Sequence, residues 1–241
     1  MDKSINELLE LISKDERVIP AHDECMRMGT HLNVSGFSEQ QKGYFVAALS
    51  SRENKKPVII TSDYGRARTF AGFLNPFIDG EVVILKPSEL SLVSAVASSR
   101  DMESARSGPI SKILRNDFGA AIICSGALMN LMIPHKTYEG RIIKLRLGLS
   151  VEPEQLVKKL ANIGYERVAQ VSAAGEFSSR GDIIDVFPPD MDNPIRLSFF
   201  DDEIDQIKTF DTDNQRSLDS LKKATICPAE EITIDPNLRG N

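Results

Sequence analysis

The sequence is poor in the residues on which conventional catalysis depends. Its 241 residues include three histidines, three cysteines and no tryptophan. Cys25, Cys124 and Cys227 are far apart and odd in number, so they fit small buried side chains in a reducing cytosol better than a disulfide framework. No apolar run reaches the roughly 18 residues that a membrane span needs, and no basic segment followed by an apolar run marks a secretory signal. These absences predict a cytoplasmic chain without membrane contact.

The chain also lacks the positive charge of a nonspecific nucleic-acid binder, which must displace counterions from phosphates. Its net charge is −6, and 41% of its residues are hydrophobic, enough for one or two real cores. Residues 1–140 carry 16 Lys and Arg against 17 Asp and Glu, whereas residues 141–241 carry 13 against 18. This shift suggests a boundary near residue 140. The near-neutral first part gives little support to direct DNA contact, which salt-sensitive DNA binding would reveal.

The first part of the sequence alternates short apolar strands with amphipathic helices. Strands are expected at 31–35, 57–61, 82–85 and 120–124. Helices are expected over 4–12, from a capping box at 38–41, in a segment up to Leu74, over 101–115, and after residue 125. Their expected caps include Ser4, Ser38, Ser62 or Asp63, and Ser125. This alternation predicts a parallel sheet covered on both faces.

The pattern of apolar residues changes after Pro134. Residues 142–149 alternate like a half-exposed strand, and a helix is expected from Pro153 until Gly164 ends it. Further strands are expected at 167–171, 175–179, 182–187, 195–199 and 204–210. This pattern predicts a small α+β module built on antiparallel strands.

The segment before the helix that begins near residue 38 occupies the position of a phosphate-binding loop, but its residues do not suit one. A working loop needs G-x-x-x-x-G-K-[ST]. Here Asn33 and Ser38 replace the outer glycines, Gly36 lies between them, Glu39 replaces the lysine and Gln40 replaces the hydroxyl residue. A carboxylate in this place would repel phosphates. The structural interpretation is that Glu39 lies in the first turn of a helix and favours its positive end.

Two acidic segments resemble metal motifs only loosely. His22–Cys25 has suitable residue types but lacks a second pair of ligands, so a structural loop is expected. Asp201–Asp205 lacks the glycine and the terminal glutamate of an EF-hand, so a solvated hairpin turn is expected. No G-x-S-x-G nucleophile motif occurs. We therefore expect no metal and no catalytic residue.

The second part of the sequence carries a distinctive set of motifs. These are Gly164–Val168, Gly175–Pro188, Pro194–Leu197, Phe199–Asp205, Phe210–Asp211 and Gln215–Leu218. Together they resemble the UvrB-homology module of the bacterial transcription-repair coupling factors (the Mfd family). The resemblance is strong over about residues 140–235 and weaker, but collinear, over the first part.

UvrB itself is a near relative in this resemblance, and it has an intact phosphate loop. Glu39 and Gln40 favour the coupling factors, in which the loop is degenerate. The alternative is a fragment of a UvrB-type ATP-dependent DNA helicase, and saturable Mg²⁺-dependent binding of an ATP analogue would favour it.

The resemblance implies a fold and a domain organisation. Residues 1–139 would form a helicase-like (RecA-type) parallel-sheet α/β domain without a working phosphate loop, called 1a. Residues 140–217 would form an inserted α+β antiparallel domain like UvrB domain 2, and 218–241 would return toward domain 1b. The chain would then be the N-terminal part of a longer protein, with much of domain 1b absent and part of the 1a sheet face uncovered. The motor and RNA-polymerase-binding modules would lie elsewhere.

The resemblance also implies a function. The segment would be a noncatalytic adaptor that recruits UvrA, the damage-recognition protein, to RNA polymerase stalled at DNA damage in nucleotide excision repair. It would need no cofactor, because ATP and Mg²⁺ would be used by the motor domains of the parent protein, an ATP-dependent DNA translocase. Another domain of the same protein would mask the UvrA-binding face until activation.

The residues expected to bind UvrA by this resemblance are Arg167, Phe177, Arg180, Asp182 and Arg196. Aromatic and arginine side chains are the usual anchors of protein interfaces. The first four are expected on an exposed strand face.

A structural alternative remains open at the same place. Arg180-Gly181-Asp182 can simply shape a turn, with Arg180 paired to Glu176 or Asp185. The residues expected to pack inward are Ile183, Val186 and Phe187.

Overall fold

The computed structural model describes residues 3–16, 19–87, 100–129 and 134–230. The chain divides into two compact units, and each is described by itself. The first falls within Met1–Pro87 and Asn116–Asn130, and the second within Ser88–Arg115 and Leu131–Asn241. Among the described residues, none of the helices combines the length and apolar character that crossing a bilayer requires.

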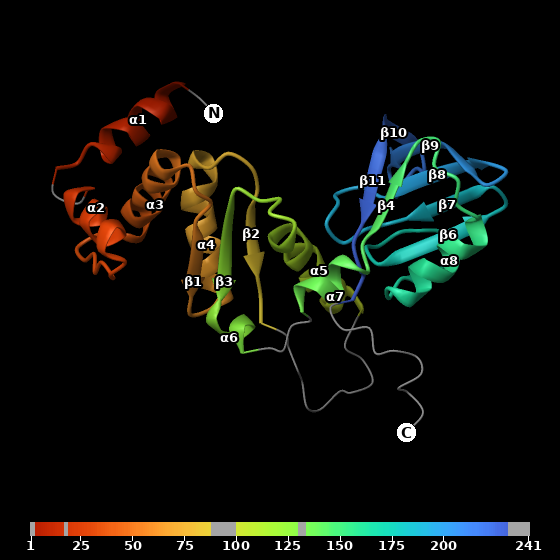
Figure 1. Cartoon of the computed structure of the whole chain (residues 1–241), viewed down its shortest axis with the longest axis horizontal. Helices are drawn as coiled ribbons and strands as arrows, with labels where there is room; N and C mark the ends of the chain where they lie inside the picture. The colour runs from red at the N-terminus through yellow and green to blue at the C-terminus, as the bar shows by residue number, and fades with distance from the viewer. Residues whose placement is uncertain (1–2, 17–18, 88–99, 130–133, 231–241) are drawn as a thin grey trace. The chain divides into compact units, whose positions relative to one another are not determined.

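The first unit contains a three-stranded parallel sheet. Its strands are β1 (Val58–Thr61), β2 (Val82–Leu85) and β3 (Ala120–Cys124), in the order β1-β3-β2, so β3 is central (Figure 1). Its helices are α1 (Lys3–Ser13), α2 (Ile19–Met28), α3 (Glu39–Glu53), α4 (Tyr64–Leu74) and α6 (Ser125–Leu128), with a 3₁₀ turn η1 (Asn75–Phe77). The expected strand–helix alternation is confirmed from residue 38 onward.

Two helices begin at the caps that the sequence predicts. The Ser38 hydroxyl accepts a hydrogen bond from the Gln41 N–H, and the Gln41 side chain accepts one from the Ser38 N–H, which completes a capping box. Asp63 caps α4 by accepting from the Arg66 N–H at 2.9 Å. This bond, followed by one from the Ser62 hydroxyl, lowers the pKa of the Asp63 carboxyl. The expected cap at Ser4 involves a side chain outside the described ones.

Three local predictions in this unit are wrong. Residues 31–35 form no strand. They are mostly exposed, and none of the strands found among the described residues pairs with them. His22–Cys25 lie in α2 and not in a loop, because Pro20 is tolerated in the first turn of a helix and nothing breaks the helix before Gly29. Ser125 is the first residue of α6 rather than its cap, and its hydroxyl donates to the Ser62 carbonyl.

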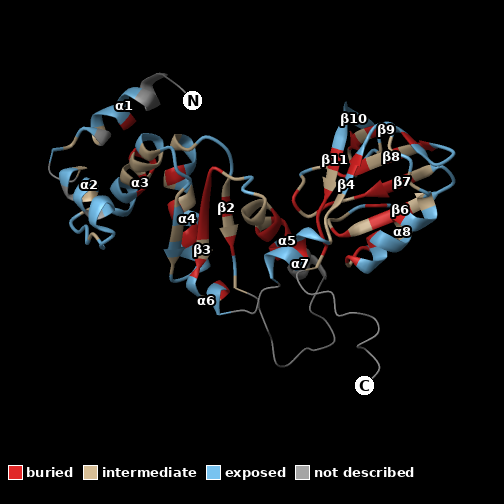
Figure 2. Cartoon of the chain, in the orientation of Figure 1, coloured by how far each residue is buried: buried red, intermediate tan, exposed pale blue. Residues whose placement is uncertain are grey.

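Helix α4 lies against one face of the sheet and α3 packs on α4. Ala47, Phe70, Leu74 and Ile122 form the core of this unit. β3 is almost entirely buried (Figure 2). The prediction that both faces are covered is wrong at β1, because Val58 and Ile60 are 59% and 61% exposed. Alternate residues of a strand point to opposite faces, so these two lie opposite the helices. An uncovered part of this sheet is what the family resemblance implies.

The second unit is dominated by a six-stranded sheet, in the order β10-β9-β8-β7-β6-β5. The strands are β5 (Glu166–Arg167), β6 (Glu176–Arg180), β7 (Ile183–Val186), β8 (Ile195–Phe200), β9 (Glu203–Phe210) and β10 (Ser217–Ser220). All neighbours are antiparallel except β5 and β6. A separate antiparallel pair joins β4 (Ile143–Arg146) to β11 (Lys223–Ile226). The helices are α5 (Arg100–Leu114), α7 (His135–Glu139) and α8 (Pro153–Asn162).

The antiparallel α+β module is therefore confirmed, with changes at its margins. The strand expected over 167–171 is reduced to Glu166–Arg167, because the chain leaves the sheet after one further bond, from the Val168 N–H to the Phe177 carbonyl. Helix α7 and strands β10 and β11 have weak apolar periodicity and were not predicted. The acidic run forms the expected turn between β8 and β9 at Asp201 and Asp202.

Helix α5 belongs to the second unit, although the sequence places it within 1–139. The Ser107 hydroxyl donates to the Pro228 carbonyl. Near the end of the helix, Ser111 and Arg115 donate to the buried Asp190 carboxylate at 3.2 and 2.6 Å. These contacts fix α5 to the loop after β7 and to the end of β11. The boundaries at 139/140 and 217/218 stay predictions.

The packing of α5 leads to a stability prediction at Gly108. A Cβ added there would lie 2.3 Å from the Pro189 carbonyl oxygen, which is backbone and cannot rotate away. We expect Gly108→Ala to destabilise the chain by about 1–3 kcal/mol through overpacking, despite a gain in helix propensity of about 1 kcal/mol. Thermal unfolding measures this. The matched control is Gly72→Ala in α4, where the added Cβ meets nothing within 4 Å and stability should rise. Equal stability of the Gly108 variant and the wild type would contradict the packing.

Candidate functional site

The six-stranded sheet has one apolar face and one polar face. Phe177, Ile184 and Leu197 lie in the core with Leu156 and Leu160 of α8, and α8 exposes its outer side (Figure 2). The opposite face carries two rows of side chains that cross the strands, and all of these side chains except Ile183 are polar. The register that forms these rows joins Ser178, Asp185, Arg196 and Lys208 in one, and Arg180, Ile183, Ser198 and Gln206 in the other. We call this surface the polar sheet face.

A buried carboxylate stands at the centre of the polar sheet face. Asp185 has a fully buried side chain, and Arg196 binds it through two bonds, from Nε to Oδ1 at 2.7 Å and from Nη2 to Oδ2 at 2.8 Å. Arg180 adds a third, longer bond from Nη2 to Oδ2 at 3.3 Å. These bonds compensate the charge of the carboxylate in the interior.

Arg196 is held from several sides. Its guanidinium lies 4.4 Å from the centre of the Phe210 ring and donates to the backbone oxygen and the side-chain oxygen of Gln215 at 3.3 Å. The hydrogen bonds to Asp185 raise the pKa of Arg196 above its ordinary value. The side chain is only 21% exposed, so Arg196 anchors the face more than it projects from it.

Arg180 differs from Arg196 in exposure. Its side chain is 56% exposed, and it precedes the turn Gly181–Asp182, in which Gly181 has φ +58°. The structural alternative is therefore confirmed in both parts, because this segment shapes a turn and Arg180 pairs with Asp185. Glu176, the other possible partner, instead accepts hydrogen bonds from Ser172 and Ala173. An exposed guanidinium with one long bond can still reach a partner.

The remaining residues expected at the interface differ in their exposure to solvent. Asp182 is exposed in the turn beside Arg180, and Arg167 is exposed on β5. The expected exposure of Phe177 is wrong, because this side chain is 1% exposed and faces Val186 across the β6–β7 register. Val186 packs inward as expected, but Ile183 lies on the polar sheet face. The structure thus brings Arg180, Asp182 and Arg196 together and places Phe177 beneath them.

Sequence reasoning assigned no role to several residues of this face. Asp185 was only a possible partner of Arg180, yet it organises both arginines. The sequence signal that could have identified Asp185 is a carboxylate inside the apolar run Ile183–Val186. Lys208, Phe210 and Gln215 are neighbours of Arg196 only through strand pairing and the loop before β10. Phe210 and Gln215 belong to the motifs of the family resemblance, but no local signal shows that they contact Arg196.

The degenerate phosphate-loop segment lies in the first unit. Glu39 begins α3, as predicted, and forms an ion pair with Lys42 at 2.6 Å. This bond lowers the pKa of the Glu39 carboxyl. The Gln40 amide donates to the Tyr44 hydroxyl, Gly36 has φ +86°, and Asn33 is exposed. Because no strand precedes this segment within 31–35, the strand–loop–helix context of a phosphate loop is missing.

Comparison with known proteins gives a family match for the second unit and relatives that are similar over most of the chain. Residues 143–232 match the family model of the UvrB interaction domain. The chain is 31% identical to the transcription-repair-coupling factor of Bacillus subtilis over 204 residues, which are 84% of this chain and 17% of the relative. It is 31% identical to that of Staphylococcus aureus (strain Mu50) and 29% identical to that of Staphylococcus haemolyticus, each over 83% of this chain and 17% of the relative.

The chain thus spans about a sixth of the length of these curated relatives. The matched region contains β4 to β11 and the whole polar sheet face. The resemblance that the sequence predicts is confirmed: the chain is similar over most of its length to the transcription-repair-coupling factors, and its second unit matches the UvrB interaction domain.

Proposed function

We propose that the chain is a noncatalytic adaptor segment of a transcription-repair coupling factor and that it binds UvrA through the polar sheet face. The observation that carries the proposal is the match to the UvrB interaction domain over residues 143–232, together with two arginines on one exposed sheet face. Arginine is enriched among residues that dominate protein interfaces, since its planar fork binds carboxylates through two bonds.

The two arginines can have different roles, one holding Asp185 and the other contacting the partner. Arg196 holds Asp185 through two short bonds, so the buried charge stays compensated when Arg180 gives up its longer bond. Arg180 is then free to swing toward a carboxylate of the partner. Asp182 adds an exposed negative charge beside Arg180, and charges of both signs favour one orientation of the partner. Arg167 pairs in register with the buried Phe177, so it lies toward the opposite face of the sheet.

Photo-crosslinking tests which face meets UvrA. A photoreactive phenylalanine analogue at Gln206, exposed on the polar sheet face, should crosslink to UvrA. The same analogue at Lys158, exposed on α8 beside the opposite face, should not. Crosslinking at Lys158 without crosslinking at Gln206 would overturn this assignment.

Arg180→Ala should separate binding from stability. Loss of its exposed side chain leaves Asp185 paired with Arg196, so we expect a change in the free energy of unfolding below about 1 kcal/mol. Binding to UvrA should weaken at least about tenfold, the ordinary effect of removing an interface hot spot. Calorimetric titration measures the affinity, and the exposed Lys158→Ala is the control. Unchanged affinity would remove Arg180 from the interface.

We further propose that the first unit is a helicase-like, RecA-type domain that binds no ATP. The pairing of Glu39 with Lys42 where a phosphate loop would need a lysine supports this. Titration with a fluorescent ATP analogue and Mg²⁺ should show no saturable signal. Saturable binding that depends on Mg²⁺ would favour the UvrB-type helicase alternative.

In this proposal the rest of the longer protein supplies what the segment lacks. The motor domains would bind ATP and Mg²⁺ and move along DNA, and another module would bind the stalled RNA polymerase. A further domain of the same chain would cover the polar sheet face until the protein is engaged. The proposed role takes place in the bacterial cytoplasm, in transcription-coupled nucleotide excision repair.

A further inference from the structure

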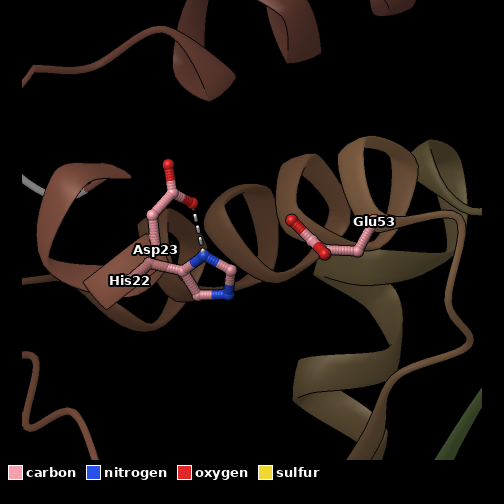
Figure 3. Close-up of side chains that lie close together, drawn as sticks. All are labelled: His22, Asp23 and Glu53. Atoms are coloured by element: carbon pink, nitrogen blue, oxygen red, sulfur yellow. Dashed lines mark hydrogen bonds and ion pairs between the residues drawn. The ribbon is translucent and has the colours of Figure 1, made fainter. Parts of the chain in front are cut away.

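Two helices of the first unit bring three metal-ligating side chains together. His22 and Asp23 lie on α2 and Glu53 lies at the end of α3, and one ligand atom of each falls within 4.8 Å of the other two. Figure 3 shows the His22 ring between the carboxylates of Asp23 and Glu53. The sequence alone predicts no metal site here, because His22–Cys25 lacks a second ligand group nearby in the chain. The fold supplies that group from Glu53.

The surroundings hold two of these side chains in place. The Asp23 Oδ1 lies 3.4 Å from Nδ1 of His22, while its Oδ2 accepts a 2.8 Å bond from Nη2 of Arg52. The His22 side chain is only 13% exposed, and Glu53 is half-buried. A carboxylate that is already oriented by a neighbouring donor is the arrangement in which metal ligands are usually found.

We propose that His22, Asp23 and Glu53 form a site for one Zn²⁺ ion that joins α2 to α3. Zinc accepts imidazole nitrogen and carboxylate oxygen at about 2.0–2.2 Å in tetrahedral geometry, which places ligand atoms about 3.5 Å apart. The His22 Nδ1 and Asp23 Oδ1 atoms are already 3.4 Å apart, and the three ligand atoms lie within 4.8 Å of one another, so rotation of the Glu53 side chain can bring its oxygen into place. Water would fill the fourth position.

The charge of the set favours a divalent cation. Two carboxylates balance the two charges of the ion, and a neutral imidazole adds a strong ligand without charge. Arg52 stays on the outer oxygen of Asp23 and leaves Oδ1 toward the site. Magnesium, which prefers six oxygen ligands, fits a set containing imidazole less well.

The role of the ion would be structural. Its ligands come from two helices of the first unit, and the polar sheet face contributes none of them. Binding to the folded state alone would stabilise the first unit by mass action. The inference therefore stands or fails independently of the proposed UvrA binding.

Titration of the whole chain with Zn²⁺ alone tests the site. We expect one equivalent to bind, and Co²⁺ in place of Zn²⁺ to give visible absorption from its bound ligands. His22→Ala and Glu53→Gln should each weaken Zn²⁺ binding at least about tenfold, and far-ultraviolet circular dichroism checks that both variants stay folded. The isosteric Glu53→Gln keeps the size of the side chain and removes only its charge.

Two control variants decide whether the bound metal uses this site. His135→Ala removes an exposed histidine of the second unit, and Cys25→Ser removes the thiol next in the same motif. Both should bind Zn²⁺ like the wild type. The proposal is overturned if no Zn²⁺ binds, if binding survives both His22→Ala and Glu53→Gln, or if Cys25→Ser abolishes it.

Discussion

Arg196→Ala should lower the free energy of unfolding of the second unit by about 3–5 kcal/mol. The fully buried Asp185 carboxylate would lose both of its short bonds and keep only the 3.3 Å bond from Arg180. A buried charge without adequate pairing is among the costliest defects in a folded protein. The Phe210 ring would also lose the guanidinium that lies against it. Denaturant unfolding, followed by circular dichroism, measures the loss.

Two comparisons isolate the cause of this effect. Arg180→Ala, which removes the exposed partner of the same carboxylate, should cost far less. The double variant Asp185→Leu with Arg196→Met removes the charge together with its partner and should recover much of the lost stability, because an apolar pair can replace a buried ion pair. Equal losses in Arg180→Ala and Arg196→Ala would contradict the central place given to Arg196.

Asp190→Ala should lower the free energy of unfolding by a similar amount, about 3–5 kcal/mol. Asp190 has a side chain that is 1% exposed, and it accepts bonds from Arg115 at 2.6 Å and Ser111 at 3.2 Å. The Cys227 thiol also donates to it at 3.2 Å. Burial, followed by the nearby Asp190 charge, raises the pKa of Cys227, so this thiol stays protonated and able to donate. Removing the carboxylate takes one acceptor away from three donors at once.

The expected result for Asp190 has its own control. Ser111→Ala removes one neutral donor at the same carboxylate and should cost about 1 kcal/mol. Limited proteolysis provides a second measurement, since the Asp190 variant should expose α5 to cleavage at a lower denaturant concentration than the wild type. If Asp190→Ala is no worse than Ser111→Ala, the carboxylate does not anchor α5.

The regular elements of the fold could largely be predicted from the sequence. The apolar strands at Val58–Thr61, Val82–Leu85 and Ala120–Cys124 and the caps at Ser38 and Asp63 follow local rules that do not depend on distant residues. The strand expected at 31–35 does not form. A strand needs a neighbouring strand to pair with, and residues 31–35 alone do not show whether one is present. Helix α5 was predicted at the correct residues, but its packing against the second unit could not be predicted, because its partners Asp190 and Pro228 lie about 80 and 120 residues away.

The candidate interface was predicted in part. Arg180, Asp182 and Arg196 could be proposed from their residue types and the family resemblance, and the structure places them close together. Phe177 was misplaced because alternation within one strand does not say which of its two faces is buried. That is decided by the residues opposite, here Val186, and by α8 covering one side of the sheet. The metal-ligating group at His22 depends on Glu53, about 30 residues away, which no local motif could show.

The central claim is that this chain binds UvrA, and calorimetric titration of the folded chain into UvrA tests it most directly. We predict saturable heat with a dissociation constant below about 10 μM, a free energy of binding near −7 kcal/mol or better. The affinity should fall at least tenfold in Arg180→Ala, while the free energy of unfolding of that variant changes by less than about 1 kcal/mol. No binding at tens of micromolar, by a chain that unfolds cooperatively in the same buffer, would contradict the account.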